Sequence, residues 1–223
     1  MTTLALPTVA GTRMVLVRHG EPEEGMRGRC YGRLDVGLSA EGREQARRTA
    51  RFLSDLPIAA VYSSPRCRAV ESANLLAAGR TPVTVDERLR EIDFGIFEGL
   101  TYKEIARRFP DTYEEWMTHP TNVAFPGGET FPAMVGRVRD AVDELRRVHP
   151  DQTIAVVSHG GVNRIALATA LDLDLRRIFR LAQAYACVNV IDYFPGEAVV
   201  RLVNCAVNCA VNGAATTLRH QRC

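Results

Sequence analysis

Four basic side chains of this sequence lie at or just beyond the ends of short apolar runs: Arg18, His19, Arg68 and His159. Short apolar runs of this kind are typical of strands that are buried on both faces of a parallel sheet. Ligands bind beyond the carboxyl ends of the strands in such sheets, so we expect these side chains to meet at one rim. A glycine follows each histidine, Gly20 or Gly160, and would let the backbone approach a ligand closely.

A cluster of positive charge at a buried rim needs an anion, because burial and mutual repulsion both disfavour the charged groups. Phosphate fits, since it carries about −1.5 to −2 charges at neutral pH and offers several acceptor oxygens to forked arginine donors. We also expect helices to begin at Ser64 and just after Gly160 and to direct backbone amides toward the anion. Either histidine taken alone could be an ordinary interior residue, whereas the combination favours a phosphate site.

The sequence lacks the signatures of several other enzymes that handle phosphate. It contains no Gly-x-x-x-x-Gly-Lys-Ser/Thr loop and no aspartate-rich cluster of the kind that a two-metal phosphatase uses. Cys67 does not lie in a Cys-x5-Arg phosphatase loop. The best candidate nucleophile is therefore a histidine, which can form a covalent phosphorylated intermediate.

The expected elements alternate between strand and helix, which indicates an α/β fold with a mostly parallel sheet. Strands are predicted at 14–18, 58–64, 81–86 and 153–159, and a closing hairpin at 186–194 and 198–204. Helices are predicted at 38–53, 64–78, 102–109, 111–118, 130–148, 161–171 and 174–181. Ser39 and Ser64 are the expected N-caps of the first two helices, and Pro65 is expected at the first helical position of the second.

The composition is that of a globular chain of 223 residues, with 46% hydrophobic and 24% charged residues and a formal net charge of +2. This near balance of charge gives no reason to expect a nucleic-acid or membrane partner. The N-terminus lacks the pattern of a signal peptide, and no apolar run approaches the length of a membrane span. The dispersed cysteines indicate free thiols and a cytoplasmic location. We expect one domain over residues 1–223, with a core at about 13–204 and a tail of unclear role at 205–223.

Six segments of the sequence resemble motifs of the histidine phosphatase superfamily, the phosphoglycerate mutase-like group, and occur in that family's order. They are LVRHGE, LDVGLSAEGREQA, SSPRCRAVESA, LREIDFGIFEG, FPGGET and VVSHGG. The resemblance implies a three-layer sandwich in which helices cover both faces of a mostly parallel central sheet. It also implies that His19 is the nucleophile that forms a phosphohistidine, and that Arg18, Arg68 and His159 neutralise the phosphoryl oxygens.

Glu91 and Glu98 compete for the role of proton donor to the leaving oxygen. The resemblance assigns this role to Glu91, in the segment LREIDFG, because family alignment places the acid in that motif. We interpret Glu98, in the segment FEG, as a structural carboxylate. The family needs no metal, and we expect no cofactor.

The segment after Arg-His-Gly-Glu departs from the pattern of many family members. Residues 22–25, Pro-Glu-Glu-Gly, stand where Ser/Thr-x-Trp-Asn is usual, so Gly25 replaces an asparagine that helps to hold phosphate. This replacement disfavours a mutase. The segment GRCYGRLDVGLS instead resembles the phosphatase branch, which includes α-ribazole phosphatases and broad-specificity phosphatases. Tyr31, Gly32 and Gly160 are expected to bind substrate, although Tyr31 could equally be a packed aromatic side chain.

We therefore expect a metal-independent phosphomonoesterase that hydrolyses a small phosphorylated metabolite through a phosphohistidine. A cofactor-dependent phosphoglycerate mutase-type transfer and a non-catalytic protein that binds a phosphorylated ligand are the alternatives. Residues 100–130 would form a lid, in which Tyr102, Phe109, Trp116 and Phe125 could contact the organic part of the substrate. The substrate stays open among α-ribazole phosphate, a phosphosugar, phosphoglycerate and a phosphoprotein. A homodimer through the closing hairpin and the tail also stays open.

Overall fold

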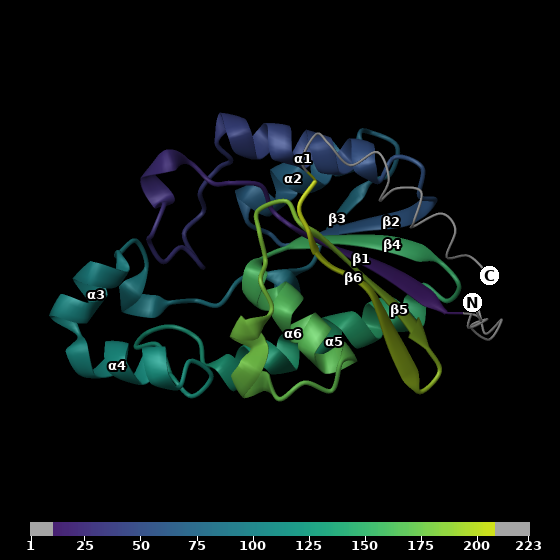
Figure 1. Cartoon of the computed structure of the whole chain (residues 1–223). Coiled ribbons are helices and arrows are strands. Elements are labelled where there is room, and N and C mark those ends of the chain that lie inside the picture. Colours follow the sequence, from purple (N-terminus) through teal and green to yellow (C-terminus); the bar gives the residue numbers. More distant parts are fainter. Residues whose placement is uncertain (1–10, 208–223) are drawn as a thin grey trace, which may run out of the picture.

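A six-stranded sheet forms the centre of the computed structural model, which describes residues 11–207 (Figure 1). The strands stand in the order β3-β2-β4-β1-β5-β6. Their bounds are Thr12–Arg18 (β1), Ile58–Ser63 (β2), Val83–Val85 (β3), Thr153–Ser158 (β4), Val188–Phe194 (β5) and Glu197–Cys205 (β6). β1 pairs in parallel with β4, β4 with β2 and β2 with β3, whereas β5 and β6 add an antiparallel hairpin. The predicted mostly parallel sheet and the predicted hairpin are thus confirmed.

Helices cover both faces of the sheet, as the three-layer prediction requires: α1 and α2 lie on one face, and α5 and α6 on the other (Figure 1). The bounds are Ala40–Phe52 (α1), Cys67–Ala77 (α2), Tyr102–Arg108 (α3), Pro110–Thr118 (α4), Phe131–Val148 (α5) and Gly160–Ala170 (α6), with 3-10 helices at Glu24–Met26 (η1), Glu87–Leu89 (η2), Gly95–Phe97 (η3) and Leu175–Arg180 (η4). Side chains alternate along β1, so Val15 and Val17 pack with α2 whereas Met14 and Leu16 pack with α5 and α6. The core therefore holds β1 from both sides up to the residue before Arg18.

Parallel pairing brings the carboxyl ends of β1, β2 and β4 to the same edge of the sheet. Arg18 lies opposite Ser158 in the pairing of β1 with β4, and Ser63 lies opposite Val157 in the pairing of β2 with β4. The residues that follow these strands therefore emerge at the same level and side by side. This register is what places the two strand-end histidines next to each other.

The start of α2 differs from the prediction. The helix begins at Cys67, so Ser64 is not its N-cap and Pro65 does not occupy its first position. The amide of Cys67 donates instead to a carboxylate oxygen of Asp35 at 2.6 Å. This leaves the Ser64 hydroxyl to contact His159, a role that no local helix signal indicates.

The other predicted elements lie within a few residues of their expected positions. The Ser39 hydroxyl caps α1 as predicted and accepts a hydrogen bond from the amide of Gly42 at 2.9 Å. The last predicted helix is the 3-10 helix η4 rather than an α-helix. The sequence repeats Asn-Cys-Ala-Val, and the second copy, at 208–211, lies outside the described residues. None of the helices between residues 11 and 207 combines the length and the apolar character that crossing a lipid bilayer requires.

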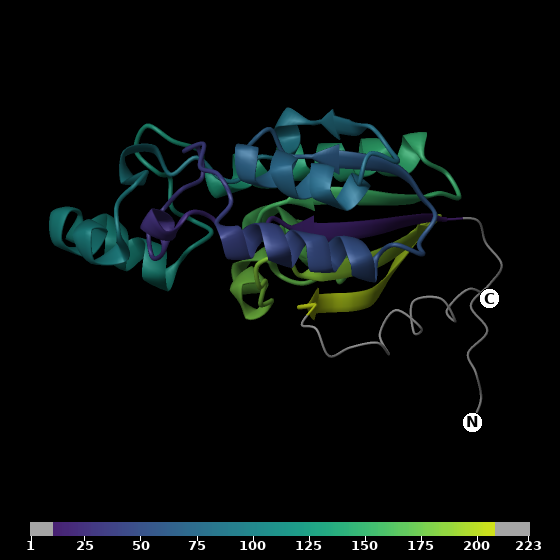
Figure 2. The same ribbon diagram turned by 90° about the horizontal axis from the view of Figure 1, so that it is seen from above.

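The segment 94–125 forms a separate layer beyond the carboxyl edge of the sheet, where α3 and α4 project away from the other helices (Figure 2). Trp116 of α4 is its centre. The Trp116 ring centre lies 5.7 Å from that of Phe94, 5.2 Å from that of Phe125 and 5.4 Å from that of Tyr102. Aromatic pairs at such distances stabilise one another beyond the area that they bury. This cluster gives the expected lid a fixed aromatic interior.

Candidate active site

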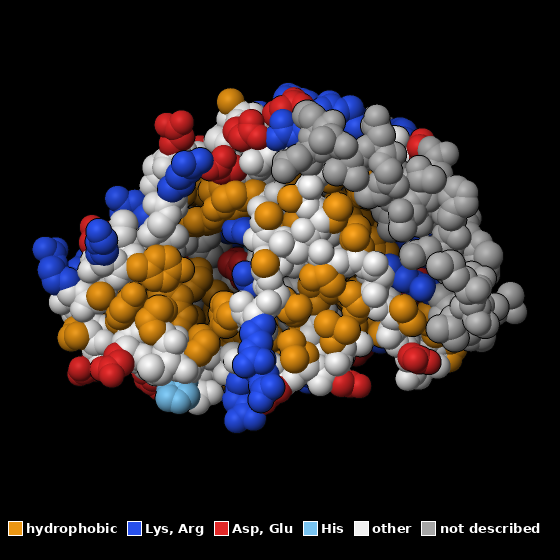
Figure 3. Space-filling model, in the orientation of Figure 1, with side chains coloured by type: hydrophobic (Ala, Val, Ile, Leu, Met, Phe, Trp, Pro, Cys, Tyr) orange, Lys and Arg blue, Asp and Glu red, His pale blue; other side chains and the backbone are white. Residues whose placement is uncertain are grey.

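A cavity of about 340 Å³ opens at the carboxyl edge of the sheet, beside α3 and α4. It is lined by every residue predicted to be catalytic: Arg18, His19, Arg68, Glu91 and His159. Tyr31 and Gly160 also line it, whereas Gly32 is not among the lining residues. In the space-filling view the hollow shows basic and acidic side chains at its floor and apolar side chains around them (Figure 3). The fold therefore brings the predicted catalytic residues of four separate segments into one site.

His19 is buried just beyond β1 and is neutral. Its Nδ1 lies 2.7 Å from the carbonyl oxygen of Gly20, which can only accept a hydrogen bond, so Nδ1 carries the proton. Burial holds the pKa of His19 well below its ordinary value of 6.5, and the charges of Arg18 and Arg68 lower this pKa further. Nε2 therefore keeps its lone pair at neutral pH and can act as a nucleophile.

His159 follows β4 and faces His19, with the two ring centres 5.1 Å apart. Its Nε2 lies 2.7 Å from the hydroxyl oxygen of Ser64, and this hydrogen bond fixes the orientation of the ring. Burial holds the pKa of His159 well below 6.5, and the charge of Arg68 lowers it further. A phosphate dianion bound beside the ring would oppose these charges and favour a protonated His159 that donates to a phosphoryl oxygen.

Arg18 and Arg68 are held in place by backbone carbonyl groups. Arg18 Nη1 donates to the carbonyl of Gln183 at 2.6 Å. The terminal nitrogens of Arg68 donate to the carbonyls of residues 31, 32 and 34 at 2.8 to 3.1 Å. Arg68 is completely buried, and this burial lowers its pKa. Carbonyl groups fix both guanidinium groups without cancelling their charge, which stays available for an anion.

Three buried nitrogen atoms of the lining residues have no hydrogen-bond partner among residues 11–207: Arg18 Nε, Arg68 Nε and His159 Nδ1. A buried polar group without a partner costs about 1–3 kcal/mol, and more where it is charged. Such groups are expected where a ligand supplies the missing acceptors. The three residues that carry these nitrogens line the same cavity as His19.

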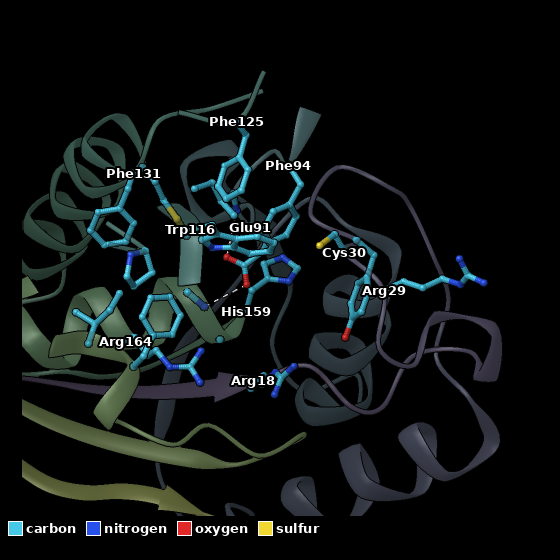
Figure 4. A pocket seen from close by; sticks show the side chains of 18 of the residues that line it. Arg18, Arg29, Cys30, Glu91, Phe94, Trp116, Phe125, Phe131, His159 and Arg164 are labelled. Carbon is cyan, nitrogen blue, oxygen red and sulfur yellow. Dashed lines mark hydrogen bonds between the residues drawn. The ribbon is translucent and has the colours of Figure 1, made fainter. Parts of the chain in front are cut away.

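Glu91 reaches the cavity from the segment after η2, and backbone amides orient its carboxyl group (Figure 4). Oε2 accepts a hydrogen bond from the amide of Gly161 at 3.1 Å, and Oε1 accepts one from the amide of Ile92 at 3.1 Å. A Cβ atom at Gly161 would lie 2.3 Å from Oε1 of Glu91, so a side chain there would displace the carboxyl group. The Gly161 amide, at the start of α6, thus holds Glu91 rather than the phosphate that we expected it to contact.

Glu98 has a different position and does not line the cavity. Its carboxylate accepts hydrogen bonds of 2.7 to 3.2 Å from four backbone amides: Gly32, Arg33, Leu34 and Phe94. It therefore ties the loop 32–34 to the segment that carries Glu91. This geometry favours Glu91 as the group that can reach a leaving oxygen and supports a structural role for Glu98.

The sequence model of the histidine phosphatase superfamily (branch 1) matches residues 14–206, which include every residue of this site. The chain belongs to the histidine phosphatase superfamily. Phosphoserine phosphatase 1 of Hydrogenobacter thermophilus is 33% identical over 193 residues, which cover 86% of this chain and 92% of that protein. A bifunctional protein of Mycobacterium tuberculosis is 37% identical over 196 residues, which cover 86% of this chain but 54% of that protein.

Solved structures agree with this assignment. The crystal structure of an α-ribazole phosphatase from Shigella flexneri superimposes with a TM-score of 0.81 at 27% sequence identity, and the match covers 90% of this chain and 100% of that chain. The predicted phosphoglycerate mutase-like fold is therefore confirmed. The family and its named phosphatases show that the chain is a phosphatase.

Tyr31 and Tyr185 form a pair at the nucleophile of this histidine phosphatase. Their hydroxyl groups are hydrogen-bonded at 2.8 Å, and their rings lie 6.4 and 5.8 Å from the His19 ring. The Arg18 guanidinium stacks on the Tyr185 ring at 4.1 Å. Burial and Tyr185 together raise the pKa of Tyr31, so its hydroxyl stays protonated. Tyr31 thus lines the cavity beside His19, and its hydroxyl group is held by that of Tyr185.

Sequence reasoning missed Tyr185 and Arg164, which both line the cavity. Tyr185 lies in an irregular segment before β5, and no local pattern indicates its direction. Arg164 could have been found, because it lies four residues after Gly160 on α6 and helical side chains point back toward the N-terminus. Its Nε donates to the carbonyl of Leu181 at 2.8 Å, which turns the guanidinium group toward the site.

We expect this histidine phosphatase, free of phosphate, to lose stability as the pH falls below about 6.5. The pKa values of His19 and His159 are lowered in the folded chain, so below the ordinary histidine pKa the unfolded chain binds protons that the folded chain does not. The contribution of each histidine to the free energy of unfolding is complete above the ordinary histidine pKa. Between that pKa and the lowered pKa of the folded chain, the contribution falls by up to about 1.4 kcal/mol per pH unit. Urea unfolding at about pH 7.5 and about pH 5.5 measures this loss, which should be smaller in His159→Gln. The same pH dependence in both proteins would contradict the prediction.

Proposed function

We propose that this histidine phosphatase is a phosphomonoesterase that hydrolyses a small phosphorylated metabolite through a phosphohistidine on His19, without a metal. The observation that carries the proposal is the position of the neutral His19 side chain. It lies in a cavity lined by Arg18, Arg68 and His159, each of which has a buried nitrogen without a partner among residues 11–207. A phosphoryl group bound there would lie among these basic side chains and face Nε2 of His19.

In the first step the lone pair of His19 Nε2 forms a bond to phosphorus while the bond between phosphorus and the ester oxygen breaks. The electron pair of the broken bond stays on the leaving oxygen, which takes a proton from the carboxyl group of Glu91. Arg18 and Arg68 stabilise the charge on the transferring phosphoryl group, and because carbonyl groups already hold them in place they need little reorganisation.

In the second step a water molecule attacks the phosphorus of the phosphohistidine. The Glu91 carboxylate takes a proton from this water, and the bond between nitrogen and phosphorus breaks. Its electron pair returns to His19 Nε2, and orthophosphate leaves the site. The enzyme is then back in its starting state, with a neutral His19 and a protonated Glu91.

Two features favour water, rather than the hydroxyl group of another alcohol, as the acceptor of the phosphoryl group. The relatives named above include proteins called phosphatases. Gly25, which replaces the asparagine of the mutase pattern, lies in η1 and does not line the cavity. A mutase-type transfer of the phosphoryl group to another alcohol is the alternative, and the same assay measures it.

The test is release of phosphate in the presence of EDTA from p-nitrophenyl phosphate, α-ribazole phosphate, 3-phosphoglycerate and phosphosugars. We expect release that EDTA does not lower. Glycerol added to the assay competes with water, and formation of glycerol phosphate faster than orthophosphate would favour the mutase-type reaction. Activity that disappears with EDTA and returns with a divalent metal would contradict the proposed metal-free mechanism.

A further inference from the structure

Apolar side chains predominate in the part of the cavity beyond the phosphate end. Six large apolar side chains line it: Phe94, Trp116, Phe125, Phe131, Met134 and Phe179. In the close-up the labelled rings gather on one side of Glu91, and Arg18 and Arg164 lie on the other side (Figure 4). Within the described chain, none of the lining residues is Asp, Asn, Gln, Ser, Thr or Lys. A ligand with many hydroxyl groups would therefore find arginine donors but few side-chain acceptors here.

We propose that this distal part binds an apolar, ring-containing leaving group, so that the substrate is a phosphomonoester of an aromatic or otherwise apolar alcohol. The inference rests on the proposed phosphomonoesterase function and adds the substrate class to it. The proposed substrate class differs from phosphosugars and from phosphorylated amino acids.

The hydroxyl groups of a sugar argue against a phosphosugar. Each hydroxyl group that leaves water without a new hydrogen bond costs on the order of 1–3 kcal/mol. Sugar sites meet this cost with carboxylate, amide and hydroxyl side chains. Among the described residues that line the cavity, Tyr102 offers a hydroxyl group that a sugar could bond. The hydroxyl groups of Tyr31 and Tyr185 already bond to each other.

The charges at the cavity disfavour the ammonium group of a phosphorylated amino acid and attract its carboxylate. Arg18, Arg29 and Arg164 line the cavity and repel an ammonium group. Glu91 is the carboxylate among the described lining residues, and backbone amides and the leaving oxygen already engage it. Because one relative is named a phosphoserine phosphatase, phosphoserine is the decisive comparison.

The aromatic walls are fixed before any ligand binds. Phe94 packs edge-to-face on Phe125 with ring centres 5.0 Å apart, and Trp116 packs edge-to-face on Phe125 at 5.2 Å. A wall that is already ordered loses little conformational entropy when a ligand binds. An aromatic ring of a ligand can stack on such walls or pack edge-to-face against them.

Two aromatic side chains at this cavity remain open to water. Tyr102, at the start of α3, is 43% exposed, and Phe179, in η4, is 53% exposed. An apolar ligand would remove part of their surface from water, which is favourable in proportion to the area covered. Phe179 also lies against the Arg164 guanidinium, 5.5 Å from its ring centre, so that an aliphatic or aromatic group could extend this stack.

The test compares phosphomonoesters whose alcohols have similar pKa values and differ in apolar surface. We expect kcat/KM for 2-phenylethyl phosphate to exceed that for ethyl phosphate by at least about tenfold. It should exceed kcat/KM for ribose 5-phosphate and for phosphoserine by a similar or larger factor. In Phe179→Ala the ratio of 2-phenylethyl to ethyl phosphate should fall by about 2- to 10-fold. Leu171→Ala is the matched control, because Leu171 is 48% exposed and does not line the cavity, and its ratio should not change.

The outcomes separate this inference from the function on which it rests. Turnover of ribose 5-phosphate or phosphoserine that equals or exceeds that of 2-phenylethyl phosphate would overturn the inference and leave the phosphomonoesterase intact. Release from none of the esters would contradict the proposed function. In that case binding of 2-phenylethylphosphonate and ethylphosphonate, measured by calorimetry, decides the inference: tighter binding of the phenyl compound supports it, and equal binding overturns it.

Discussion

His19→Ala is expected to lower phosphate release by at least about 10⁴-fold, because the substitution removes the atom that attacks the phosphorus of the ester in the first step. The side chain is buried and its Nδ1 is hydrogen-bonded, so Nε2 has the position and the lone pair of a nucleophile. Phosphate release from p-nitrophenyl phosphate measures the loss. Rapid quenching of the wild type with labelled substrate should in addition trap a phosphoprotein that is stable in base and labile in acid, as a phosphorus–nitrogen bond is.

The matched control is His119→Ala, since His119 is exposed and does not line the cavity. It should keep wild-type activity. Circular dichroism and binding of orthophosphate show whether His19→Ala is folded with its anion site intact. A folded His19→Ala protein that still turns over substrate at the wild-type rate would exclude the phosphohistidine, and so would a phosphoprotein that is trapped on another residue.

Glu91→Gln is expected to lower kcat/KM for an alkyl phosphate by about 10²- to 10⁴-fold, the usual contribution of a general acid. The effect on kcat/KM should be much smaller for p-nitrophenyl phosphate, whose leaving group departs without a proton. This dependence on the leaving group is the diagnostic result, because a merely structural change would lower both values by a similar factor. Measuring kcat/KM for ethyl phosphate and p-nitrophenyl phosphate in the same variant gives the comparison, since kcat/KM reports the first step and excludes hydrolysis of the phosphohistidine, in which Glu91 acts on both substrates alike.

Glu98→Gln is the control for this prediction. Glu98 accepts four backbone hydrogen bonds, and an amide nitrogen in place of one oxygen would face a donor instead of accepting from it. We expect lower thermal stability and an equal effect on both substrates. If instead Glu98→Gln showed the dependence on the leaving group and Glu91→Gln did not, the two glutamates would have to exchange roles.

Much of the fold and the polar end of the site follows from local sequence patterns. The apolar run before Arg18 and the run before Ser158 predict two buried strands, which the structure contains as β1 and β4. Parallel pairing then requires that His19 and His159 lie at one edge, because the carboxyl ends of parallel strands meet there. Strand and helix periods and helix caps are short-range properties of the chain, so they can be recognised without its tertiary structure.

Other parts of the site depend on contacts between distant segments. Ser64 looks like a helix cap in the sequence, but in the structure its hydroxyl orients His159. The amide of Gly161 looks like a phosphate ligand, but it holds the Glu91 carboxyl group. A polar group near a helix start has several chemically reasonable partners, and only the packing of other segments decides which one it meets.

The sequence by itself therefore determined the class of fold, the strand ends and the family, and with them the side chains that can handle a phosphoryl group. Only the tertiary structure decided how these side chains are oriented, that Tyr185 and Arg164 join them, and which aromatic side chains line the distal cavity. The physical reason is that a strand or helix is stabilised by neighbours in the sequence, whereas the wall of a cavity is assembled from segments whose side-chain directions are set by long-range packing. Trp116 and Phe179 come from α4 and η4, and nothing in their local sequence shows that they share a cavity.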